Sequence, residues 1–367
     1  MRAVPSLLAS RTATPAATST GPSSTPTEQP AAPSAGPSSP ALCPVPSFAH
    51  SPGHGLPQYS IAELELLHNY HTSTAQSLSS NPVLFPFWRV DVPKISFGWP
   101  CLLNGLFSVS ALHLAHFRPE SRHHYLAQAD VYWDLALRSA TPLLESIDDS
   151  NCHATYVFSI LAAFYLLGKG PRPGDFLAFD AEGTAGTLLH TRATRIIIES
   201  NSEVLRNGPA AVPFDVGIRC VSWWSLPDPA GEHALVQELR FILAYLEDSH
   251  RRAGSDDVYR AEIDNLSRSY HAVAAERSAV GRVSTQAIFV WLYRLSDEFL
   301  DCLRQHEPMA LTIFAYFVVL LKELDIAWYL HGWVTHLISG IHHALSPGTR
   351  TWIRTPIERI GWIPPTP

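Results

Sequence analysis

The chain has 367 residues, of which 46% are hydrophobic and 16% are charged, and its net charge is −7 with histidine counted as neutral. This length fits about two domains, or one large helical domain with a tail. The acidic balance argues against nucleic-acid binding through a broad basic face, which needs clustered lysine and arginine.

Residues 1–57 differ in composition from the rest of the chain. They contain twelve prolines and many serine, threonine and alanine residues, but one acidic residue, Glu28, and two arginines. Such a segment cannot bury enough apolar surface to offset the entropy lost on ordering. We therefore expect a disordered tail or linker here and a folded body over residues 58–367. A transit peptide is the alternative, although the interrupting prolines make a poor amphipathic helix.

The first half of the body carries clear helix signals. Ser60 and Glu63 form a capping box before an apolar stripe with helical spacing. Pro100 and Pro119 each stand where a helix begins. Ser150 is expected to cap a further helix. The predicted helices span residues 61–78, 100–117, 119–137, 152–167 and 187–199.

The second half of the body begins with a segment that is harder to assign. From Pro209 to Pro229 the chain contains several prolines and tryptophans, and we expect a connection without a helix. Helical patterns resume after it, and no strand with period-two alternation and no internal repeat is present. The predicted helices span residues 232–248, 256–278, 284–305, 308–324 and 326–346. The pattern predicts an all-α fold, a multi-helix bundle.

Two apolar runs raise the question of a membrane protein. Residues 156–167 and 309–321 are 12 and 13 residues long. Both are shorter than the roughly 20 residues that span a bilayer. We therefore expect core helices and no membrane span.

Eighteen histidines and five cysteines raise the question of a metal site. Eight of the histidines fall in two groups, which are His113, His116, His123 and His124, and then His331, His336, His342 and His343. Neither group has the H-E-x-x-H spacing, and no C-x-x-C pair is present. We expect no metal site in this chain, and reduced, buried thiols.

A helical bundle with apolar helices also raises the question of a terpene cyclase, which holds magnesium with a D-D-x-x-D motif. Asp148 and Asp149 start such a motif, but Cys152 stands in place of the third aspartate. The sequence contains no G-x-S-x-G elbow, no phosphate-binding loop and no G-x-G-x-x-G motif. We therefore expect no catalytic residues and a protein that is not an enzyme.

Three separated blocks of sequence resemble one family. They are IAELELLHNY from Ile61, PCLLNGLFSVSALHLA from Pro100, and WYLHGW from Trp328. In this order, over residues 59 to about 363, they are similar to the C-terminal regulatory domain of fungal zinc-cluster transcription factors, which carry a binuclear zinc, six-cysteine cluster. The resemblance is to the sterol uptake control protein type in particular.

The resemblance implies an all-α regulatory domain that acts in the nucleus, in transcription by RNA polymerase II, and binds a sterol or another lipid in an apolar pocket. The C-terminal block is also dense in aromatic residues, and bundles place ligands between helices. Core packing of the same side chains is the alternative. The predicted pocket residues are Phe314, Phe317, Trp328, Gly332 and Trp333.

The zinc cluster of the family is not encoded in these residues, because it needs six cysteines and the chain has five. We expect no cofactor here, and zinc only if such a cluster lies upstream. DNA contact would then require that upstream domain or a partner protein, and a homodimer is a further open alternative. The alternative function is a stand-alone lipid-binding or protein-interaction module without DNA binding, with the cytoplasm as its location.

Overall fold

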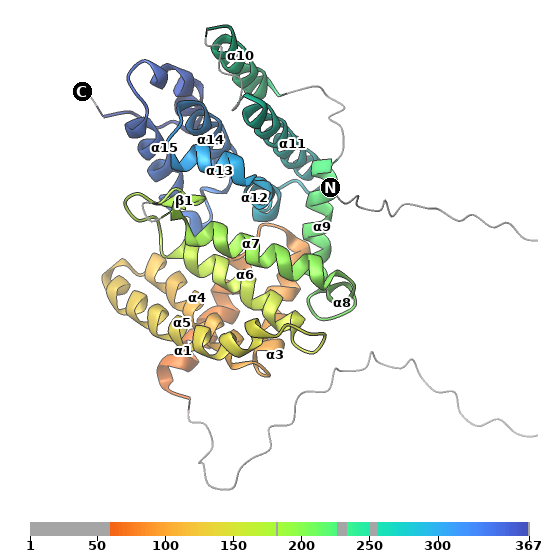
Figure 1. Ribbon diagram of the computed structural model, residues 1–367. Coiled ribbons are helices and arrows are strands. Elements are labelled where there is room, and N and C mark those ends of the chain that lie inside the picture. The colour runs from red at the N-terminus through yellow and green to blue at the C-terminus, as the bar shows by residue number, and fades with distance from the viewer. Residues whose placement is uncertain (1–58, 181–182, 226–232, 250–255, 366–367) are drawn as a thin grey trace, which may run out of the picture. The chain divides into compact units, whose positions relative to one another are not determined.

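The computed structural model describes residues 59–180, 183–225, 233–249 and 256–365 (Figure 1). The predicted tail at 1–57 lies outside the described residues. The regular secondary structure of the described residues is helical apart from one pair of two-residue strands, so the predicted all-α class is confirmed.

The described α-helices fall into three groups along the chain. The first group comprises α1 (Ile61–Asn69), α2 (Ala75–Ser77), α3 (Val92–Ser96), α4 (Pro100–Phe117), α5 (Arg122–Glu145) and α6 (Cys152–Gly168). The middle group comprises α7 (Gly186–Ser200), α8 (Ser202–Arg206), α9 (Ala211–Ser225), α10 (Ala234–Ser249) and α11 (Asp256–Val280). The last group comprises α12 (Thr285–Arg294), α13 (Asp297–Arg304), α14 (Pro308–Leu321), α15 (Trp333–Ala344) and α16 (Arg354–Ile360). Strands β1 (Phe179–Asp180) and β2 (Gly183–Thr184) pair antiparallel.

Of the four predicted helix starts, two are confirmed and one is wrong, and Pro119 begins a single 3-10 turn (Pro119–Ser121) three residues before α5. Ser60 and Glu63 form a reciprocal capping box at α1, and Pro100 is the first residue of α4. Ser150 does not cap α6. The residue before α6 is Asn151, and Asp148 Oδ1 instead accepts the backbone N–H groups of Ser150 and Asn151, which folds this turn ahead of the helix.

The core is built around two apolar helices. Helix α4 packs against α5 and α6, and α14 packs against α11, α15 and α16 (Figure 1). The run at 309–321 is buried at every position except Val319. It forms a core helix, as the sequence predicted. Among the described helices, none is long and apolar enough to cross a membrane.

The expected connection from Pro209 to Pro229 is wrong over its first part, which forms α9. Pro213 lies in the first turn of this helix, where the backbone N–H has no intrahelical partner to lose. The end of the expected connection, from residue 226, lies outside the described residues.

Two long helices predicted near the C-terminus are interrupted. The helix expected at 284–305 breaks after Arg294, and Ser296 caps α13 by accepting the N–H of Phe299. The helix expected at 326–346 begins only at Trp333. Gly332 precedes it with a φ of 84°, a left-handed conformation that ends any helix before it.

Candidate ligand-binding site

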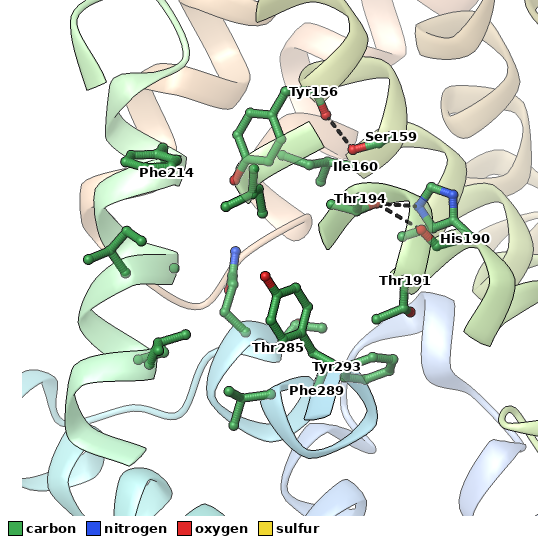
Figure 2. Close-up of a pocket in the computed structure, with 18 of the residues that line it drawn as sticks. Tyr156, Ser159, Ile160, His190, Thr191, Thr194, Phe214, Thr285, Phe289 and Tyr293 are labelled. Atoms are coloured by element: carbon green, nitrogen blue, oxygen red, sulfur yellow. Dashed lines mark hydrogen bonds between the residues drawn. The ribbon is translucent and has the colours of Figure 1, made fainter. Parts of the chain in front are cut away.

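A cavity of about 490 Å³ lies among α6, α7, α9 and α12 (Figure 2). Its size falls in the usual range of small-molecule sites. Figure 2 shows Phe214 on α9 across the cavity from Thr191 and Thr194 on α7. Most of the lining surface is apolar, and side chains from all four helices contribute to it. The apolar side chains include Ile160, Phe164, Ile198, Phe214, Ile218 and Phe289.

The helices around the cavity meet through their apolar faces. Helix α6 contacts α7, and α9 contacts both α11 and α12. On α9, Phe214, Ile218 and Val221 recur at helical spacing and all face the cavity. The cavity is therefore positioned by helices that are separated in sequence and packed together by the same core.

Polar groups in the cavity are mainly hydroxyls. Ser159 Oγ donates to the carbonyl of Tyr156, and Thr194 Oγ1 donates to the carbonyl of His190, at 2.7 and 3.0 Å. Side chains that donate to their own helix keep oxygen lone pairs for other donors. The rings of Tyr156 on α6 and Tyr293 on α12 enter the cavity from opposite sides (Figure 2).

His190 is the histidine that lines the cavity. Burial lowers its pKa to about 4, and a hydrogen bond to the backbone of Ser159 opposes that shift. Its Nε2 lies 3.4 Å from Thr194 Oγ1. The imidazole is therefore neutral at pH 7, so it adds hydrogen-bonding capacity to the wall without adding charge.

Two charged side chains line the cavity. Glu199 on α7 pairs with Arg195 on the same helix, with Arg195 Nε 2.8 Å from Glu199 Oε1. Arg294 at the end of α12 places its guanidinium over the rings of Trp224 and Tyr293, at 5.2 and 5.7 Å from the ring centroids. An apolar chamber with one aromatic-stacked arginine fits an amphipathic small molecule better than a purely hydrocarbon one.

None of the five sequence-predicted pocket residues lines this cavity. Phe314 and Phe317 are fully buried on α14 and pack against Trp291, with ring centroids 5.8 and 4.5 Å away. They lie in the packed core, which is the alternative that the sequence left open. Whether any of the five contacts a ligand stays a prediction.

The other three predicted pocket residues lie at the start of α15 or in the segment just before it. Trp333 Nε1 donates to the carbonyl of Leu167, a cavity-lining residue, at 2.9 Å, so it supports the wall from behind. Trp328 Nε1 donates to Ser77 Oγ at 3.0 Å. Gly332 lies just before α15 and not inside the helix predicted at 326–346, and a Cβ there would meet no described protein atom within 4 Å.

The two histidine groups meet in space at one point. The ring of His116 on α4 lies 5.2 Å from that of His331, and the ring of His113 lies 5.4 Å from Trp328. Burial lowers the pKa of His113 to about 4. Within the described residues, no group of three or more histidine, cysteine, aspartate or glutamate side chains is arranged to hold a metal ion.

Sequence reasoning missed the cavity because it assigned no helix to residues 209–225. The signal was present as Phe214, Ile218 and Val221, whose spacing of four and three residues matches one helix face. The wall from α7 gave a weaker signal, because Thr187, Thr191 and Thr194 resemble a solvated face rather than a cavity lining.

Comparison with curated proteins relates the chain to one class. It is 25% identical over 323 residues to a Zn(2)-C6 fungal-type transcription factor of Gibberella zeae, across 79% of this chain and 59% of the relative. It is 24% identical over 254 residues to the Zn(2)-C6 fungal-type transcription factor afumD of Aspergillus fumigatus, across 68% of this chain and 64% of the relative. The chain thus spans less than two thirds of the length of each relative.

These matches establish distant homology to fungal zinc-cluster transcription factors, and both relatives are transcription factors rather than enzymes. No model of a protein family matches the chain.

Proposed function

We propose, from this distant homology, that the chain is the regulatory part of a fungal zinc-cluster transcription regulator that acts in the nucleus. The observation that carries the proposal is the similarity to a transcription factor over 323 residues, a stretch longer than any one helical block. The all-α body agrees with the regulatory domain that the sequence blocks resemble.

DNA contact in this proposal comes from outside the 367 residues. The body is acidic, and the five cysteines of the chain are too few for a six-cysteine cluster. The four cysteines in the described residues are buried as free thiols on α4, α6, α9 and α13. A zinc-cluster domain upstream, or a partner that carries one, would therefore bind the DNA and the zinc.

The helical body in this proposal responds to a sterol or another lipid. The cavity among α6, α7, α9 and α12 supports this, because it is largely apolar and large enough for a small molecule. A ligand that binds there would bridge helices from distant parts of the chain and stabilise one arrangement of them.

The test is a transcription assay with the full chain fused to a bacterial DNA-binding domain in a fungal host. We expect the fusion to change transcription from a reporter several-fold relative to the DNA-binding domain alone. Ile218→Trp, which fills the cavity, should alter the response of the reporter to added lipid. Ile196→Trp is the matched control, because Ile196 is 64% exposed on α7 and does not line the cavity.

Reporter transcription equal to that of the DNA-binding domain alone would contradict the regulatory function and favour a stand-alone binding module. A fluorescent tag on the full chain tests location in the same cells. Nuclear accumulation is the expected result, and a uniformly cytoplasmic signal would contradict it.

A further inference from the structure

Arg294 is a cation at the wall of the cavity with an unused hydrogen-bond donor. It is the last residue of α12, and its guanidinium stacks on Trp224 and Tyr293. Its Nε is buried and has no hydrogen-bond partner among the described residues. A buried donor without an acceptor is costly, and a guanidinium N–H is a strong donor to a carboxylate.

Within the part of the chain that the structure describes, no carboxylate forms an ion pair with Arg294. Glu199, the acidic residue that lines the cavity, is engaged by Arg195. Arg195 itself lies over the Tyr293 ring at 5.3 Å, so this ring has an arginine close to it from each of two helices. The wall at Tyr293 therefore carries net positive charge beside an apolar chamber.

We propose that the cavity binds an amphipathic anion, with an apolar body among α6, α7 and α9 and a single carboxylate at Arg294. The carboxylate pairs with the guanidinium of Arg294 and neutralises its charge. The apolar body contacts Phe214, Ile218 and Phe289. This inference rests on the proposed ligand-sensing function and narrows its ligand from lipids in general to acidic ones.

The test compares two probes with the same carbon chain, dodecanoate and dodecan-1-ol, by isothermal titration calorimetry on the full chain below their aggregation concentrations. We expect dodecanoate to bind at least tenfold more tightly than dodecan-1-ol. Arg294→Gln should reduce the ratio of the two affinities to about one, because it weakens the binding of dodecanoate and leaves that of dodecan-1-ol unchanged.

Arg268→Gln is the matched control variant. Arg268 on α11 stacks on the same Trp224 ring, at 4.9 Å, but it is exposed and does not line the cavity, so its loss should leave the ratio unchanged. A cation at the end of α12 also favours the helix itself, so the melting temperature of each variant is measured and binding is compared well below it.

Three results would overturn the inference, and they separate it from the proposed function. Equal affinity of the wild-type protein for both probes would show that the carboxylate is not recognised, while an apolar binding cavity would still stand. The same loss of ratio in Arg268→Gln shows a general charge effect instead of a contact at Arg294. Binding of neither probe, with no effect of Ile218→Trp on thermal stability in their presence, overturns the lipid-binding function as well.

Discussion

Two glycines in this protein should respond to alanine with opposite signs. Gly332 has a φ of 84°, and a Cβ added to its backbone would meet no atom within 4 Å, so the cost of a methyl group there is in the backbone alone. The left-handed conformation destabilises the folded state by about 1–2 kcal/mol for a residue with a Cβ. Alanine also has fewer conformations than glycine in the unfolded chain, which stabilises the folded state by about 0.4–1 kcal/mol and offsets part of that cost. Gly332→Ala should therefore lower the free energy of unfolding by about 1 kcal/mol.

Gly217 is the comparison, because it also has open space around a Cβ but lies inside α9 with no left-handed φ. Alanine in a helix is favoured over glycine by about 0.5–1 kcal/mol, so Gly217→Ala should raise the free energy of unfolding by that amount. Guanidinium denaturation of both variants and the wild type, followed by circular dichroism, measures the two midpoints. A Gly332→Ala midpoint at or above that of the wild type would refute the left-handed turn before α15.

Three further predictions follow from buried groups. Burial raises the pKa of Glu262, so its contribution to stability is full below the ordinary glutamate value and is lost as pH rises through the folded pKa. Glu262→Gln should therefore raise the melting temperature more at pH 8 than at pH 5, and an equal change at both would contradict this. Trp333→Phe removes one of two donors to the Leu167 carbonyl, which keeps the backbone N–H of Gly170, so loss of this bond should lower the free energy of unfolding by about 0.5–1.5 kcal/mol. An unchanged denaturation midpoint would contradict a contribution of the bond to stability. Burial raises the pKa of Cys101 to about 11 and that of Cys220 to about 12. Iodoacetamide at pH 8 should therefore label both only after denaturation, and peptide mass mapping that finds native labelling would contradict their burial.

The parts of the fold that could be predicted are those where local chemistry determines the structure. The capping box at Ser60 and the proline at position 100 act within one helical turn, and both mark real helix starts. The run at 309–321 could be assigned to the core because its length and apolar character leave no other place for it.

The parts that could not be predicted depend on contacts between distant segments or on single backbone conformations. A break after Arg294 and a left-handed Gly332 interrupt stretches whose hydrophobic pattern is continuous. The cavity is harder still, because its walls come from four helices and a wall residue has the same sequence pattern as a packed one. The density of aromatic residues pointed to α14, whose side chains are packed in the core. It gave no sign of the cavity beside α9.

The cavity and the most recognisable sequence blocks occupy different helices. The described lining residues run from Leu78 to Arg294, so α14, α15 and α16 contribute none of them. Substitutions at Phe214, Ile218 or Phe289 can therefore change the shape and polarity of the chamber while the C-terminal core stays intact. Under the proposed ligand-sensing function, proteins that share this core could differ in ligand through substitutions on α9 and α12 alone.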